Sequence, residues 1–145
     1  MKHALAKIAR AAVVTALITG AVAMAQMPET ASPKNAKVYF ANLKDGDIVT
    51  GPVKIVMGLS GMGIAPAGIE FPDTGHHHLV IDAPTPNAGE PIPADDTHVH
   101  FGKGQTEVTL NLEPGRHTLQ LVLADRNHVP HKPAVVSPVI MVLVR

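Results

Sequence analysis

The sequence predicts an all-β protein, and three observations support this fold class. Apolar residues recur at every second position in several segments, which is the period of a strand with one buried face. The 145 residues include 13 Pro and 12 Gly, which are typical of the turns between short strands. After residue 26, no segment has the 3.6-residue apolar period of an amphipathic helix.

The composition limits the class of protein. A chain of 145 residues favours one domain, and 46% hydrophobic with 17% charged residues indicates a globular protein. The net charge of zero argues against a nucleic-acid partner, because neutralising phosphates requires a basic surface. The chain contains no Cys, which excludes disulfides, thiolate metal sites and Cys nucleophiles.

The N-terminus has the pattern of a secretory signal peptide. An uncharged apolar run at 11–23 ends in the sequence Ala-Met-Ala, which matches a small-residue cleavage site. The basic residues before this run are Lys2, Lys7 and Arg10. The run is shorter than the roughly 20 residues that span a bilayer, so we favour a signal peptide over a membrane anchor. We therefore expect a signal peptide at 1–25, cleavage before Gln26 and a periplasmic or secreted protein with no later membrane span.

The elements of the mature chain follow from the same alternation. Residues 26–35 contain two prolines and polar side chains, and we expect them to be a flexible lead-in. A single domain should then occupy 36–145. Alternation is clearest at 53–59, where Val53, Ile55, Met57 and Leu59 take every second position. The predicted strands are 37–42, 53–59, 76–82, 97–101, 107–112, 118–123 and 134–144.

These strands favour an immunoglobulin-like antiparallel β-sandwich of about seven strands. Turn sequences such as Lys44-Asp45-Gly46-Asp47 and Glu113-Pro114-Gly115-Arg116 separate them. The Cys…Trp…Cys core of antibody domains is absent, so the likeness is one of architecture. A small barrel is the main alternative.

Histidine is the unusual residue type, with 9 His against only 3 Phe and 1 Tyr. Three segments hold most of the histidines, at 75–82, 97–101 and 127–131. Strand parity predicts that His77 points toward the core with Leu79, while His76 and His78 point to the other face. The same argument places the side chains of the His-x-His pair at 98–100 together on one face.

If these strands are neighbours, their facing Cβ atoms lie roughly 5 Å apart and the imidazoles can converge on one ion. The candidate ligands are His76, His78, His98, His100, His128 and His131. Imidazole suits copper and zinc, and the Irving–Williams order favours copper. Nearby carboxylates could orient the rings as hydrogen-bond acceptors; these are Asp73, Asp82, Asp95 and Asp96.

Other roles remain open for these histidines. A hydrogen-bonded network or incidental surface positions would also account for the cluster in sequence. His117 begins an apolar strand, and we expect a buried or edge histidine that is bonded to backbone. We expect His77 to be structural as well.

Several motifs together resemble an exported bacterial family of domains of unknown function. They include Gly75-His76-His77-His78-Leu79, Pro91-Ile92-Pro93-Ala94-Asp95-Asp96, His98-Val99-His100-Phe101-Gly102 and Gly104-Gln105-Thr106-Glu107. The resemblance covers 36–145. It implies export and a compact all-β domain, and it brings no activity or ligand with it.

Three functions remain in view. The leading hypothesis is an exported, non-catalytic protein that binds copper or zinc through its histidines. The second is an envelope interaction module, whose His- and Pro-rich loops contact a protein or a glycan and need no metal. The third is a metal-dependent hydrolase, with Asp95 or Asp96 as the base that activates a metal-bound water; no clear acid–base constellation supports it.

Overall fold

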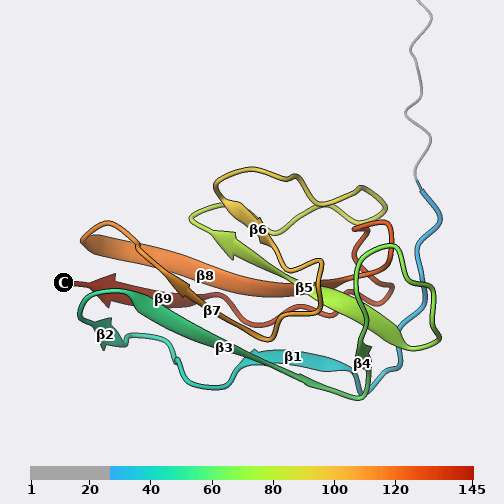
Figure 1. The fold of residues 1–145 in the computed structure, drawn as a ribbon, viewed down its shortest axis with the longest axis horizontal. Helices are drawn as coiled ribbons and strands as arrows, with labels where there is room; N and C mark the ends of the chain where they lie inside the picture. The colour runs from blue at the N-terminus through green and yellow to red at the C-terminus, as the bar shows by residue number, and fades with distance from the viewer. Residues whose placement is uncertain (1–26) are drawn as a thin grey trace, which may run out of the picture.

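The computed structural model describes residues 27–145, so the predicted signal peptide at 1–25 lies outside the described residues (Figure 1). Within this range the chain forms strands and turns and no helix. The strands are β1 (Lys37–Phe40), β2 (Ile48–Val49), β3 (Val53–Ser60), β4 (Gly63–Ile64), β5 (Thr74–Ile81), β6 (His98–His100), β7 (Glu107–Leu110), β8 (Gly115–Ala124) and β9 (Ile140–Val144). The described part of the chain therefore offers no helix that could cross a membrane.

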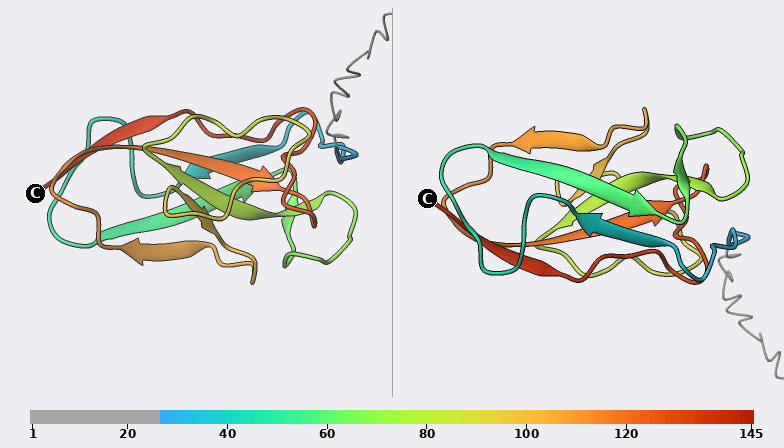
Figure 2. Two further views of the ribbon diagram at one scale, coloured as in Figure 1. Left: turned by 90° about the horizontal axis from the view of Figure 1, so that it is seen from above. Right: turned by 90° about the horizontal axis from the view of Figure 1, so that it is seen from below.

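Two sheets pack face to face. One contains three strands in the order β1-β3-β7, and the other follows the order β2-β9-β8-β5-β4, with β6 also paired to β5. Figure 2 shows the second sheet from above and the first from below. All pairings are antiparallel except two short ones, β2 with β9 and β4 with β5. The predicted all-β sandwich is confirmed; the additional strands β2 and β4 have only two residues each.

The main core lies between the sheets. From the three-stranded sheet come Val53 and Ile55, both 0% exposed, and from the other sheet come Leu79, Leu121 and Leu123, also 0% exposed. The alternation of apolar residues in β3 and β8 thus points to the inter-sheet space, as the period of two predicts.

The outer face of β5 and β8 is also covered, which the sequence did not predict. The segment 82–97, which joins β5 to β6, folds back over this face (Figure 1). Ile92 from this segment packs with Val80 and Val122 in a second, smaller apolar cluster. As a result, β5 is buried on both faces from Gly75 to Ile81. Side chains that parity places away from the core are therefore enclosed rather than solvated.

Two ends of the chain differ from the expected pattern. The predicted strand at 134–144 is regular only from Ile140, because Pro138 has no N–H to donate to a ladder. Its first part still bonds to β8, through Leu123 N to Val135 O (2.9 Å) and Ser137 N to Leu121 O (2.9 Å). The segment expected to be a flexible lead-in is hydrogen-bonded to residues near 132, as described below.

The buried face of β8 should carry much of the folding energy. Replacing Leu121 by Ala leaves a cavity between the sheets, and we expect the free energy of unfolding to fall by about 2–5 kcal/mol. Thr109→Ala on the exposed side of β7 is the control and should change it by less than about 0.5 kcal/mol. Urea unfolding measures both. Equal effects of the two changes would contradict this assignment of the core.

Candidate metal centre

The outer face of β5 holds two histidines. His76 and His78 are each 1% exposed, and their Nε2 atoms lie 3.0 Å apart. One of these nitrogens must be protonated and donate a hydrogen bond to the other, because two lone pairs would repel. Parity places His77 on the opposite face, where it is 0% exposed, as predicted.

Strand β6 adds a third ring. Its register sets His100 directly opposite His78, and the two ring centroids lie 5.0 Å apart. The His100 ring is also 5.0 Å from that of His76. A Cβ on Gly102 would overlap the His100 imidazole, so a residue without a side chain is needed at position 102 to accommodate this ring. His100 is exposed and gives the cluster an opening to solvent.

The loop after β8 adds the fourth ring. His128 lies in a turn and has a left-handed φ of 67°. Its ring centroid is 4.6 Å from that of His100 and 5.1 Å from that of His76. The carbonyl of His128 accepts a hydrogen bond from Ile92 N (2.9 Å), which ties this turn to the covering segment 82–97.

Three chain segments thus bring four imidazoles together, and we call His76, His78, His100 and His128 the histidine cluster. In three of them, His76, His100 and His128, one ring nitrogen each lies within 4.8 Å of the other two. This spacing is close enough for the three histidines to hold a metal ion. A cavity of about 180 Å³ opens onto the cluster; it is lined by His78, Pro91, Ile92, Pro93, Ala94, His100 and His128.

Burial and mutual repulsion keep the inner rings neutral. The pKa of His78 is lowered to about 2, first by burial and then by the neighbouring imidazoles of the cluster. The pKa of His76 is lowered to about 4, first by burial and then by His100 and His128. The pKa of His100 is lowered as well, first by desolvation and then by His128. Neutral imidazole is the form that binds a metal ion.

Two of the six candidate ligands lie outside the cluster. His98 shares the face of His78, but its Nδ1 lies 2.8 Å from Asp95 Oδ1 and 3.0 Å from Thr97 Oγ1. His131 is 2% exposed, and its Nε2 lies 2.8 Å from where a Cβ on Gly75 would be. By parity, a Cβ on Gly75 would lie on the core face of β5, whereas the side chain of His76 lies on the outer face.

The two histidines expected to be structural both lie outside the cluster, and only His117 has hydrogen-bond partners among the described residues. His117 Nε2 lies 2.8 Å from the carbonyl oxygen of Glu113, and its Nδ1 lies 2.6 Å from Asp82 Oδ2. The first of these bonds, followed by the second, raises the pKa of His117. His77 points into the core, and neither of its ring nitrogens has a hydrogen-bond partner within the described chain.

The carboxylates considered as supports for the rings act elsewhere. Asp82 bonds to His117 and Asp95 to His98, which is not in the cluster. No hydrogen bond joins Asp73 or Asp96 to a cluster ring within residues 27–145.

The carboxylate next to the cluster is Asp125, which the sequence reasoning missed. An Asp three residues before His128, at a turn between strands, was the available signal.

Comparison with known proteins gives a family and no function. A family model described as a domain of unknown function (DUF4399) matches residues 55–145, which include all four members of the histidine cluster. No curated protein and no solved structure matches the chain.

The inner histidines make the fold sensitive to acid. Unfolded histidines titrate near 6.5, whereas folded His76 and His78 titrate at about 4 and about 2. Below pH 6.5 the unfolded chain therefore binds more protons, and stability falls. Each histidine contributes up to about 1.4 kcal/mol per pH unit until its folded pKa is reached. His117, whose pKa is raised, stabilises the fold below pH 6.5 and offsets only part of this loss.

We therefore expect the free energy of unfolding of the metal-free protein to decrease steadily from pH 7 to pH 5. Urea unfolding at intervals of half a pH unit measures it. A flat profile over this range would contradict the burial of neutral rings.

His77 gives a second test, in which we expect the free energy of unfolding to rise. A buried polar group without a partner costs about 1–3 kcal/mol, and the core face of β5 is otherwise apolar. We expect His77→Leu to raise the free energy of unfolding at pH 7 by about 1 kcal/mol or more. His78→Leu serves as the comparison on the other face. Destabilisation by His77→Leu, measured by urea unfolding, would show that this ring has a role in the core.

Proposed function

The chain belongs to the family described as a domain of unknown function (DUF4399), and we propose that this member is a non-catalytic metal-binding protein. It binds copper or zinc through the histidine cluster. One observation carries the proposal: ring nitrogens of His76, His100 and His128, from three separate segments, lie within 4.8 Å of one another.

The donor set supports this choice of metals. Imidazole nitrogens suit Cu(II) and Zn(II), and the chain has no Cys to form a thiolate site. His78 lies beside the three close ligands, with its ring centroid 4.9 Å from that of His76 and 5.0 Å from that of His100. It is the natural fourth ligand of a tetrahedral site. At equal availability, the Irving–Williams order predicts tighter binding of copper.

Burial supports a binding role over a surface role. An isolated buried imidazole is costly, and here His76 and His78 are buried with their ring centroids 4.9 Å apart, while His78 Nδ1 lacks a partner within the described residues. A bound ion supplies a partner for these nitrogens. The exposed His100 provides the route by which an ion reaches the inner rings.

The proposal includes export. The N-terminal pattern of basic residues, apolar run and Ala-Met-Ala supports a signal peptide and a periplasmic or secreted location. There, an ion would be exchanged with the extracytoplasmic medium.

Calorimetric titration of the purified protein with Cu(II) and with Zn(II) at pH 7 tests the proposal. We expect one ion per chain, and a gain in thermal stability that corresponds to about 2.7 kcal/mol when free metal is 100 times the dissociation constant. His100→Ala and His128→Ala should each weaken binding at least tenfold, because each removes one of three close ligands.

His117→Ala is the matched control. It removes an imidazole of β8 that is hydrogen-bonded to Glu113 O and Asp82, outside the cluster, and we expect metal affinity to be unchanged. Heats equal to those of buffer, together with no stabilisation by either metal, would overturn the proposal. The envelope interaction module without metal would then be the hypothesis to pursue.

A further inference from the structure

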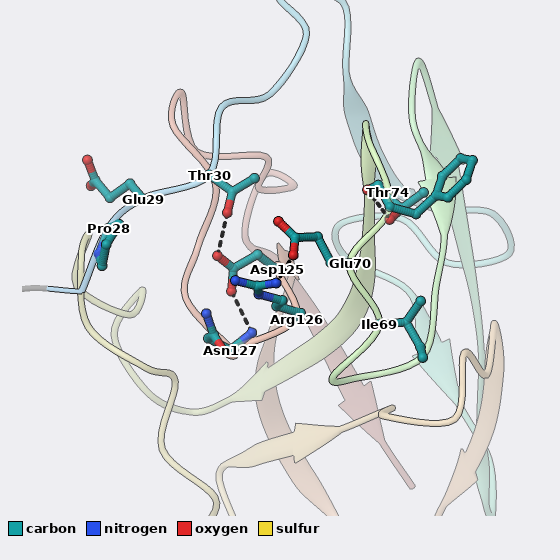
Figure 3. Close-up of a pocket in the computed structure, with 10 residues that line it drawn as sticks. Pro28, Glu29, Thr30, Ile69, Glu70, Thr74, Asp125, Arg126 and Asn127 are labelled. Atoms are coloured by element: carbon teal, nitrogen blue, oxygen red, sulfur yellow. Dashed lines mark hydrogen bonds and ion pairs between the residues drawn. The ribbon is translucent and has the colours of Figure 1, made fainter.

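Asp125 is a buried carboxylate beside the histidine cluster. It is 4% exposed and follows Ala124, the residue of β8 that pairs with His76. Among the described residues it has no ion-pair partner, in contrast to the exposed pair of Arg126 and Glu70 next to it (Figure 3). A buried carboxylate without a counter-ion needs other partners, and three hydrogen bonds supply them.

Two of these bonds shape the turn that carries His128. Asp125 Oδ1 accepts from the backbone N of Asn127 (2.8 Å) and of Val129 (3.1 Å). Asp125 N also donates to Val129 O and His128 N to Asp125 O, each at 2.9 Å. His128 adopts a left-handed φ of 67°, which a residue with a side chain rarely takes unless its surroundings impose it. The carboxylate of Asp125 is thus a main restraint on the direction of the His128 ring.

The third bond comes from the segment 27–32, which we call the N-terminal strap. Thr30 Oγ1 donates to Asp125 Oδ2 at 2.6 Å, as the dashed line in Figure 3 shows. The strap is held alongside Lys132 by Ser32 N to Lys132 O (3.0 Å) and Lys132 N to Thr30 O (2.9 Å). Met27 N donates to Gly89 O (3.2 Å), so the strap also contacts the segment that covers the cluster.

Charge gives Asp125 a second role. A divalent ion bound beside the buried rings of His76 and His78 brings a charge of +2 into a poorly solvated place, which is unfavourable without a nearby negative charge. The carboxylate of Asp125 is close to the cluster in the fold, because Asp125 directly follows Ala124, which pairs with His76, and accepts two hydrogen bonds from the turn that carries His128. None of the four histidines carries a compensating charge of its own.

We propose that Asp125 is the positioning residue and the counter-charge of the metal centre, and that Thr30 of the N-terminal strap holds it in place. This inference rests on the proposed function. It extends the site from the ligands to a carboxylate and a strap residue that contact no metal.

Asp125→Asn separates charge from geometry. The amide can still accept from Asn127 N and Val129 N and can donate to Thr30 Oγ1, so the turn keeps its bonds while the charge is lost. We expect Zn(II) and Cu(II) affinity to fall by about tenfold or more, a typical effect of losing a partner outside the ligand set. Competition titration against a chelator of known affinity measures it.

Asp82→Asn is the matched control. Asp82 also accepts from a backbone N–H, that of Thr118 (2.7 Å), and bonds to a side chain, that of His117. It follows the other end of β5, away from the cluster. We expect its metal affinity to equal that of the unchanged protein.

Thr30→Val tests positioning without a change of charge. It removes the bond to Asp125 Oδ2 and keeps the shape of the side chain. We expect weaker metal binding and an altered electron paramagnetic resonance spectrum of bound Cu(II), because the turn of His128 loosens. Thr30→Ser should restore both. Ser32→Ala, which removes a strap bond to Pro133 O instead, should change neither.

The outcomes separate the two proposals. If the unchanged protein binds metal and Asp125→Asn binds as tightly, the inference about Asp125 is overturned and the metal site stands. If Thr30→Val leaves affinity and spectrum unchanged, the role of Thr30 is overturned. If the unchanged protein binds no metal, the proposed function fails and this inference fails with it.

Discussion

The central constraint in this protein is the burial of β5 on both faces. This strand lies between β8 on one side and β4 and β6 on the other, with the opposite sheet below it and the segment 82–97 above it. Successive side chains must therefore enter two different enclosed spaces. One space is the apolar core between the sheets, and the other holds His76 and His78. The pairing registers of β5 with β6 and β8 then decide which residues meet these two rings.

Burying histidines has an energetic cost, and this cost differs between the two faces of β5. His77 lies among apolar residues with no polar partner within the described chain, so it contributes only the penalty of desolvation. On the other face, the neighbouring rings add to the effect of burial in lowering the pKa of His76 and His78, and the four rings face a shared space. In the proposed function, a bound cation would offset this cost. This is the expected relation between stability and function at a binding site.

The two loops that close the cluster are irregular, and hydrogen bonds rather than strand pairing hold them. The turn of His128 is organised by Asp125, and the covering segment is tied to that turn through Ile92. The N-terminal strap contacts both loops, through Thr30 and through Met27. The parts of the site with the least regular secondary structure are thus connected to one another by specific polar contacts. These contacts explain how a rigid pair of strands and two loops can form one site.

The sequence by itself determined the fold class and the faces of the strands, because the period of two along a strand is a local property. Parity separated His77 from His76 and His78, and the backbone bond of His117 was likewise predictable. Only the tertiary structure decided that His100 and His128 meet this pair while His98 and His131 do not. That outcome depends on strand register, on loop paths and on a carboxylate at a turn, all of which are contacts between residues far apart in the chain. Local patterns carry no information about such distances, so the site could be suspected from the histidines and located only in three dimensions.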